Sequence, residues 1–371
     1  MQKESINNRQ DKYKAIWLSH SSIGDYEKCP RLYYLHDVYK DPKTKRKINI
    51  TSPYMSLGIA VHNVVEALKT FKVEERREII ESTKDSLISS ASFAGAGEKK
   101  ENTFELKSEG EEEISNKNLL ENFDAEFAKV TGKKGGFISS EQEAEFKERG
   151  VNMIKNVIAD PKMLLSKTVS TKSYYTGDML PNFYISPEEN IILCGNVDWI
   201  EYHEPSATKE LDNKNGSISV VDFKTGKNEE KENSMQLPIY KILLEELQHK
   251  WKVVSGKYWY LESGEVVTKE IEESRIQEVK DKIIKIGIEI RDKKLQWLEG
   301  ADYARTKNNF DSKNAGWVAR DNFEENFKCA RDSGESSSQY ECDCKKYEKT
   351  LAGEAEYLGV DMYNKDLYFI N

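Results

Sequence analysis

The sequence predicts an α/β protein in which a mixed β-sheet is flanked by helices and interrupted by a helical insertion. Two observations support this fold class. Apolar residues recur at helical spacing in the first 170 residues, whereas the region 183–271 alternates like short strands around one helix. The resulting order of helix, three strands, helix and further strands is typical of a sheet covered by helices. The chain has 371 residues, which is long enough to bury a sizeable core.

The first helical region spans 21–40, where we expect a break at Pro30 because proline does not fit a helix interior. Ser21 or Ser22 can cap its start. A second helix is predicted over 56–71, because its apolar residues repeat at spacings of three and four and so form one face.

The loop between these helices, KDPKTKRK at 40–47, is rich in lysine and arginine. It is either a patch that contacts phosphates or a solvated loop. The region 72–170 is mostly charged helix, and its middle part, 89–117, has the Gly, Ser and Glu content of a connecting segment.

Strands follow. Two are predicted within 183–202 around the turn Pro-Glu-Glu-Asn at 187–190, and a third over 217–225, with a polar hairpin loop at 203–216 between them.

A helix is then expected from about 234 to 249, starting near Pro238. Two strands at 256–263 and 265–271 precede a long amphipathic helix over 272–299.

The composition limits the function classes. The charged fraction is 33% and the net charge is -9, which argues against non-specific coating of nucleic acid but not against an enzyme with a local basic patch. No apolar run approaches membrane-spanning length. The N-terminal segment 1–17 is polar, so we expect neither a signal peptide nor an anchor, and a cytoplasmic protein.

The stretch SVVDFKTGK places an acid and a base at the end of an apolar strand. Residues two apart in a strand share a face, so Asp222 and Lys224 point one way while Val221 and Phe223 pack on the other. Asp198 lies in the preceding predicted strand, three residues after a glycine.

If these consecutive strands pair, the carboxylates of Asp198 and Asp222 converge. Their repulsion is relieved by a bound cation, and hard oxygen ligands select Mg²⁺ or Mn²⁺. Lys224 beside the metal can orient an attacking water and stabilise charge on a phosphate, which is the chemistry of metal-assisted phosphodiester hydrolysis. A structural Asp–Lys pair remains the alternative.

Two further features fit this site. His62, on the apolar helix, is either a third metal ligand or a core histidine. Gln236 and Tyr240 share a helical face after the Asp-x-Lys strand, where they either meet a phosphate or a base or merely cap and pack.

The motifs LGxxxH (57–62), GxxD (195–198), DxK (222–224) and QxxxY (236–240) occur in one order. The chain thereby resembles the PD-(D/E)XK nuclease superfamily, in particular the RecB-like branch that includes the AddB nuclease domain and the CRISPR-associated RecB-like exonucleases. The resemblance covers about 18–350 and implies a restriction-endonuclease-like sheet.

The resemblance also implies site residues. It implies catalytic Asp198, Asp222 and Lys224, and a metal held by His62, Asp198, Asp222 and the backbone carbonyl of Phe223. It further implies substrate-binding roles for Gln236, Tyr240 and Arg31.

The same branch often carries an iron–sulfur cluster held by one cysteine ahead of the histidine motif and three near the C-terminus. Cys29 fits the first position, and Cys329, Cys342 and Cys344 supply three more. The wide spacing between the second and third departs from the family pattern. The resemblance implies a [4Fe-4S] cluster in preference to a zinc ion, and four unconnected thiols are the alternative. Cys194 is predicted to be an apolar core residue.

The sequence therefore predicts a metal-dependent exonuclease that acts on single-stranded DNA ends in repair, recombination or defence, with helicase, repair or defence proteins as partners. The alternatives are a non-cutting nucleic-acid-binding module of the same fold and an unrelated α/β protein with structural salt bridges. TGKN at 225–228 lacks the first glycine and the Ser/Thr of a phosphate loop, which excludes an NTPase of that type. The predicted regions are a polar tail (1–17), N-terminal helices (18–71), a helical insertion (72–170), the nuclease core (171–300), a cysteine-containing region (301–350) and a C-terminal tail (351–371).

Overall fold

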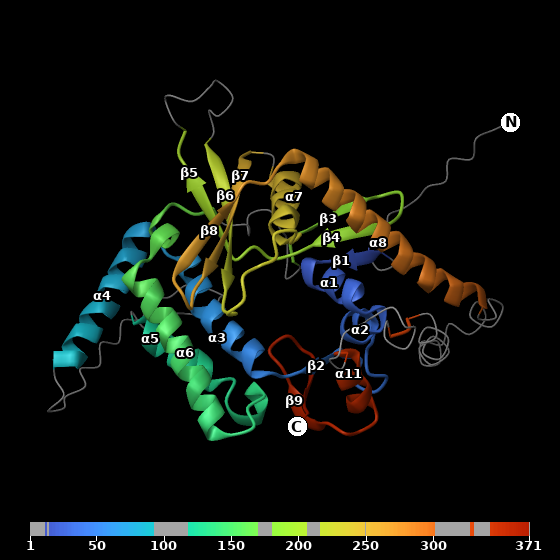
Figure 1. The fold of residues 1–371 in the computed structure, drawn as a ribbon, viewed down its shortest axis with the longest axis horizontal. Helices are drawn as coiled ribbons and strands as arrows, with labels where there is room; N and C mark the ends of the chain where they lie inside the picture. The colour runs from blue at the N-terminus through green and yellow to red at the C-terminus, as the bar shows by residue number, and fades with distance from the viewer. Residues whose placement is uncertain are drawn as a thin grey trace. The chain divides into compact units, whose positions relative to one another are not determined.

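The structure is a computed structural model. It describes residues 12, 15–92, 118–169, 180–205, 216–248, 250–300, 327–329 and 342–370. The chain forms two compact units, each assembled from several segments (Figure 1). Unit 1 comprises Met1–Ile50, Tyr175–Asn196 and Glu272–Leu367, and unit 2 comprises Thr51–Tyr174, Val197–Ile271 and Tyr368–Asn371.

Unit 1 contains two small three-stranded sheets, of order β1-β4-β3 and β2-β10-β9, together with helical segments. In the first sheet β1 is parallel to β4, and β3 is antiparallel to β4. The strands and helical segments of unit 1 are β1 (Ile16–Leu18), α1 (His20–Lys28), α2 (Pro30–Tyr33), η1 (Tyr34–Val38), β2 (Ile48–Ile50), β3 (Asn182–Ser186), β4 (Ile191–Cys194), α8 (Glu273–Gly300), α11 (Cys344–Leu351), β9 (Glu356–Val360) and β10 (Asp366–Phe369). The last two residues of β10 belong to unit 2.

The long helix α8 covers the β1-β4-β3 sheet, as its contacts with all three strands show. A glycine makes this close packing possible. A Cβ atom at Gly287 would lie 2.6 Å from the Cδ1 atom of Ile191, so only a residue without a side chain fits there.

The break that the sequence predicts at Pro30 is confirmed, because α1 ends at Lys28 and α2 begins with the proline. The predicted cap was wrong. Ser19 caps α1, and its side chain and that of Ser22 each accept a hydrogen bond from the other's backbone N–H.

Unit 2 contains a four-stranded mixed sheet of order β5-β6-β7-β8. β5 and β6 are antiparallel, β6 and β7 are parallel, and β7 and β8 are antiparallel. This confirms the predicted mixed sheet. The segments of the unit are α3 (Pro53–Ala67), η2 (Leu68–Thr70), α4 (Val73–Ser92), α5 (Leu119–Ala128), η3 (Gly132–Gly135), α6 (Ser140–Ala159), η4 (Lys162–Leu165), β5 (Trp199–His203), β6 (Ser217–Lys224), α7 (Gln236–Gln248), β7 (Lys252–Tyr260) and β8 (Glu265–Lys269).

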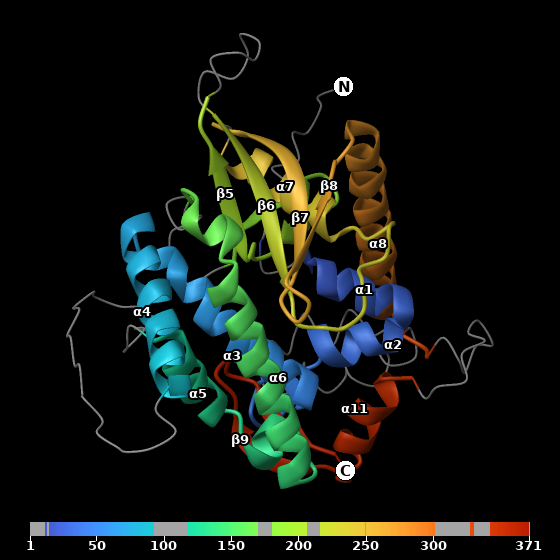
Figure 2. The same ribbon diagram turned by 60° about the vertical axis from the view of Figure 1, so that its left-hand side comes forward.

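The two faces of this sheet have different neighbours. Val221, Phe223 and Trp259 belong to the hydrophobic core that α3, α5 and α6 share (Figure 2). The crossover helix α7 packs on the other face, where Leu237 lies against Gly256. Asp222 and Lys224 therefore lie on the α7 side of β6, as their alternation with Val221 and Phe223 predicts.

One strand prediction was wrong. The segment 183–202 forms three strands rather than two, because the second is interrupted after Cys194. Gly195 lies at this break, where a glycine has no side chain to pack against a neighbouring strand. As a result β4 and β5 belong to different sheets and different units, and Asp198 is a bend residue just before β5 instead of a residue inside a strand.

Of the connecting segment predicted at 89–117, residues 89–92 form the end of α4 and the rest lies outside the described residues, as does most of the hairpin loop at 203–216. Among the described helices, none is sufficiently long and apolar to cross a membrane.

Candidate active site

The β5–β6 hairpin brings two acids to one place. Trp199 pairs with Val221, so the residues next to this pair, Asp198 and Asp222, lie at the same end of the hairpin. Asp198 Oδ2 accepts a hydrogen bond of 2.8 Å from the backbone N–H of Phe223. Both carboxylates are buried. Burial, followed by the charge of Asp222, raises the pKa of Asp198 to about 7.

His62 on α3 joins these acids. Its Nδ1 atom lies 3.1 Å from Glu66 Oε1 and 3.7 Å from Asp198 Oδ2, and its Nε2 atom lies 3.1 Å from the carbonyl oxygen of Phe223. Burial alone would lower the pKa of His62, but the hydrogen bond to Glu66 and the charges of Asp198, Glu66 and Asp222 raise it to about 9. In the absence of a metal ion the ring is therefore an imidazolium at neutral pH, and both nitrogens donate.

Glu66 is a site residue that the sequence analysis missed. Single ligand atoms of His62, Glu66 and Asp198 lie within 4.8 Å of one another, a spacing that suits a metal ion. The second oxygen of Glu66 accepts a hydrogen bond of 2.7 Å from Lys69, which also donates to the carbonyl of Val197. The signal in the sequence was the spacing of four from His62, which places both side chains on one helical face.

Lys224 lies among oxygen atoms at the end of β6. Its Nζ atom is 2.9 Å from Asp222 Oδ2 and 3.3 Å from Glu230 Oε1, and it donates to Gln236 Oε1 at 2.6 Å. Burial lowers the pKa of Lys224, but the carboxylates of Asp222 and Glu230 outweigh it and the pKa is raised. The ammonium group thus stays charged beside Asp222. Glu230 was also missed, and its local sequence carries no motif that would have indicated it.

Gln236 and Tyr240 both contact the same carboxylate. The Gln236 amide donates to Asp222 Oδ1, and the Tyr240 hydroxyl donates to that oxygen at 3.1 Å. Both side chains are buried. Their shared face of α7 is thus directed at Asp222 in the structure, and the substrate-binding role stays a prediction.

The residues fit a divalent cation. Within the described part of the chain, the buried Oδ2 atom of Asp222 has the Lys224 ammonium, 2.9 Å away, as its charged partner. Burial and then the repulsion from Asp222 raise the pKa of Asp198. A cation would satisfy that oxygen and remove the repulsion, and carboxylate, imidazole and carbonyl groups are suitable ligands for Mg²⁺ or Mn²⁺.

Comparison with known proteins agrees with this geometry. The family model of the PD-(D/E)XK nuclease superfamily matches residues 17–310. The chain belongs to the PD-(D/E)XK nuclease superfamily. PD-(D/E)XK proteins usually use divalent metals, in accord with the donor set around Asp198. No curated protein matches the chain.

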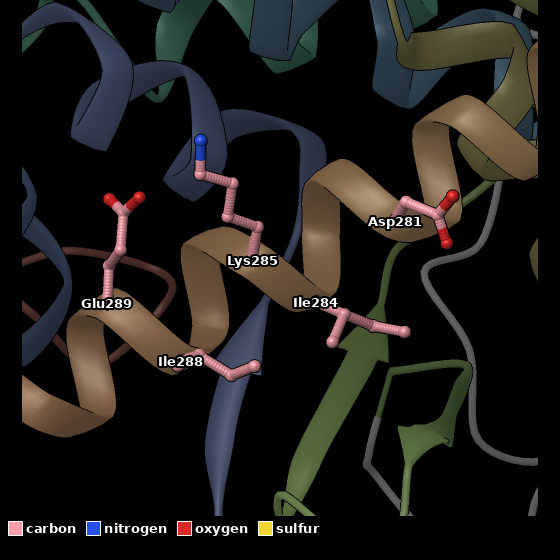
Figure 3. Close-up of a pocket in the computed structure, with 5 residues that line it drawn as sticks. All are labelled: Asp281, Ile284, Lys285, Ile288 and Glu289. Carbon is pink, nitrogen blue, oxygen red and sulfur yellow. The ribbon is translucent and has the colours of Figure 1, made fainter.

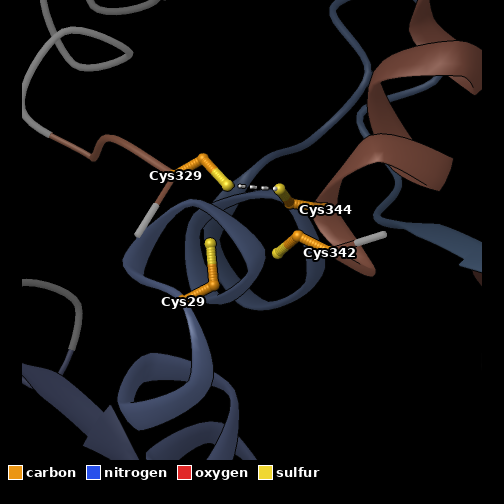
Figure 4. Close-up of side chains that lie close together, drawn as sticks. All are labelled: Cys29, Cys329, Cys342 and Cys344. Atoms are coloured by element: carbon orange, nitrogen blue, oxygen red, sulfur yellow. Dashed lines mark hydrogen bonds between the residues drawn. The ribbon is translucent and has the colours of Figure 1, made fainter. Parts of the chain in front are cut away.

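A second constellation lies in unit 1, where four cysteines meet (Figure 4). The sulfur atoms of Cys29, Cys329, Cys342 and Cys344 lie within 4.8 Å of one another. Cys29 follows α1, and Cys344 begins α11, so the cluster joins segments from the two ends of the chain. Four cysteines this close could hold a metal cluster. The polar interval between Cys329 and Cys342 lies outside the described residues.

The fifth cysteine lies at the end of β4. Cys194 is buried, as predicted for a core residue, and burial followed by the charge of Asp37 raises the pKa of its thiol to about 11. It therefore stays a neutral thiol at physiological pH.

Arg31 also lies in unit 1. Its Nε atom donates to Glu348 Oε1 at 3.2 Å, and its guanidinium lies 5.8 Å from the centre of the Tyr34 ring. A role of Arg31 in substrate binding stays a prediction. In the basic loop 40–47, Lys40, Lys43 and Lys45 are exposed, which agrees with both interpretations of that loop.

A hollow of about 380 Å³ lies on α8 (Figure 3). A single helix supplies all its lining residues: Asp281, Ile284, Lys285, Ile288 and Glu289. Figure 3 shows their polar ends spread along the helix instead of converging, so this hollow lacks the arrangement of a catalytic site.

Proposed function

We propose that the chain is a metal-dependent deoxyribonuclease that hydrolyses phosphodiester bonds with Mg²⁺ or Mn²⁺. The observation that supports this most directly is the buried pair of Asp198 and Asp222 with the Lys224 ammonium 2.9 Å from Asp222. His62, Asp198, Asp222 and the carbonyl oxygen of Phe223 would hold the metal, which when bound polarises the phosphate and makes water a better nucleophile.

The remaining roles belong to the side chains around this pair. Lys224 is charged and stabilises the negative charge that develops on the phosphate oxygens. Gln236 and Tyr240 orient the Asp222 carboxylate by donating to one of its oxygens. Glu66 orients the His62 ring by accepting from Nδ1.

The proposed substrate is single-stranded DNA, and the proposed mode is exonucleolytic cleavage from an end. A non-cutting binding module of the same fold is less well supported. Burying Asp198 beside Asp222 costs free energy, as the raised pKa of Asp198 indicates. A module that only binds phosphates does not need such a pair of buried acids.

We further propose that the four cysteines hold a [4Fe-4S] cluster, with zinc as the alternative. Such a cluster would stabilise unit 1 by joining Cys29 to residues about 300 positions further along the chain. Its contribution would be structural, because all four cysteines lie in unit 1 and the residues of the proposed catalytic site lie in unit 2.

The test is a cleavage assay on end-labelled single- and double-stranded DNA, with Mn²⁺ and with chelator. We expect metal-dependent release of nucleotides by the wild-type protein and loss of at least about 1000-fold in rate for Lys224→Ala and Asp222→Asn. Lys224→Ala removes charge stabilisation in the transition state, and Asp222→Asn removes the charge of a proposed metal ligand. Lys231→Ala is the control, because Lys231 is an exposed lysine seven positions after Lys224 in the sequence. Cleavage by Lys224→Ala at the wild-type rate would reject the assignment.

A further inference from the structure

An exposed tyrosine lies on the same face of α3 as His62. Tyr54, Gly58 and His62 follow one another at intervals of four residues, so they form one line along the helix. Eight residues of helix separate Tyr54 from His62 by about 12 Å along the axis. The Tyr54 side chain is 68% exposed, whereas aromatic residues with a packing role in this unit, such as Trp199 and Trp259, are fully buried.

The Tyr54 ring is held in place although it is exposed. It makes a T-shaped contact with the Phe146 ring, with a centroid distance of 5.1 Å and an interplanar angle of 81°. The Arg149 guanidinium lies 5.9 Å from the Tyr54 centroid and 5.0 Å from that of Phe146. Arg149 is in turn fixed by Glu262, with contacts of 2.9 and 3.3 Å. A rigid aromatic surface loses little entropy when a flat ligand binds.

The same contacts connect Tyr54 to the end of the Asp-x-Lys strand. Lys227, three residues after Lys224, lies 3.8 Å from the Glu262 carboxylate and is 65% exposed. Gly58 is close to the same segment, because a Cβ atom there would lie 3.4 Å from Thr225 Oγ1. Tyr54 and Lys227 are thus connected through Arg149 and Glu262, and the helix that carries Tyr54 contacts the segment just after Lys224.

We propose that Tyr54 is a stacking platform for a nucleobase of a single-stranded substrate, and that Lys227 contacts a phosphate of the same strand. This inference rests on the proposed nuclease function and specifies how its substrate is held. An unpaired base presents a π-face to an exposed aromatic ring, whereas a paired base inside a duplex is already stacked on its neighbours. The stacked base would lie a short distance along the strand from the scissile phosphate, because Tyr54 is separated from His62 along α3.

The experiment scans a single abasic nucleotide through a fluorescent single-stranded oligonucleotide. Binding to the full chain is measured by fluorescence anisotropy in chelator, so that metal-dependent cleavage does not interfere. For the wild-type protein, we expect one abasic position to weaken binding about tenfold. For Tyr54→Ala, the intact oligonucleotide already binds about tenfold more weakly, and the abasic nucleotide at that position causes no further loss.

Companion variants separate stacking from other effects. Tyr54→Phe keeps the ring and should bind like wild type, while Lys227→Ala should weaken binding of all sequences and reduce its salt dependence. Ile138→Ala is the control, because Ile138 in the same unit is also 68% exposed. A Tyr54→Ala protein that responds to abasic nucleotides as wild type does would overturn the inference. An equal loss of affinity for duplex DNA in Tyr54→Ala would also overturn it. If the abasic effect appears but the wild-type protein cleaves nothing with Mn²⁺, the platform stands and the nuclease assignment fails.

Discussion

The Nε2 atom of His62 lies 3.1 Å from the carbonyl oxygen of Phe223, although 161 residues separate them in the sequence. The imidazolium of His62 lies among groups that carry negative charge or accept hydrogen bonds: Asp198, Glu66 and the Phe223 carbonyl. These groups favour a positive charge at this position, whether it is a proton on His62 or a divalent cation.

The first prediction concerns pH in the absence of metal. The pKa of His62 is raised from 6.5 to about 9 in the folded protein, so the protonated ring stabilises the fold below pH 6.5. This stabilisation is lost as the pH rises through about 9. Thermal unfolding in chelator should therefore show a fall in melting temperature between pH 6.5 and 9.5. The His62→Gln protein should show a smaller fall, and equal pH profiles for the two proteins would contradict the prediction.

The second prediction concerns Glu66. Glu66→Gln removes the charge that holds the His62 ring, so we expect the apparent affinity for Mn²⁺ to fall about 10- to 100-fold while the rate at saturating metal changes little. The measurement is a Mn²⁺ titration of DNA cleavage. Glu81→Gln on α4 is the control, because Glu81 is exposed and its side chain contacts a lysine on the same helix. An unchanged Mn²⁺ titration for Glu66→Gln would show that the carboxylate does not support the metal site.

The third prediction concerns the four cysteines. Cys29→Ala removes one of four converging sulfur atoms, so we expect the purified protein to lose its iron and its visible absorption, and to melt at a lower temperature. Iron is measured in protein purified without oxygen. Cys194→Ala is the matched control, since it changes a buried cysteine of the same unit that lies outside the cluster, and it should keep its iron. Colourless wild-type protein with zinc would favour the alternative metal.

The fourth prediction tests the packing of α8. In Gly287→Ala the new methyl group would meet the Ile191 side chain at 2.6 Å, so we expect a loss of about 1–3 kcal/mol in the free energy of unfolding. In Gly24→Ala, in α1 of the same unit, the new methyl group has no atom of the described residues within 4 Å, so this change should stabilise the protein by about 0.5–1 kcal/mol. Thermal or denaturant unfolding measures both. If Gly287→Ala were as stable as Gly24→Ala, helix α8 would not pack on β4 as described.

Much of the fold could be predicted because the signals were local. The strand pattern of the segment 217–225 predicted β6, and the apolar period at 56–71 predicted α3. The helix expected from about 234 to 249 is α7. The short strands β1, β2 and β10 could not be predicted in this way. They have three or four residues each, too few for a period to appear, and they form only because distant segments offer them partners.

The sequence by itself determined which chemical groups are available and in what order: two acids and a lysine in or beside apolar strands, a histidine on an apolar helix, and cysteines near both ends. Only the tertiary structure decided which groups meet. It divided one apolar segment between two sheets, placed Glu66 beside His62 and Asp198, and directed Gln236 and Tyr240 at Asp222. The physical reason is that strand and helix periods depend on neighbouring residues. Contacts between residues far apart in the chain depend instead on how whole elements pack, which no local pattern encodes.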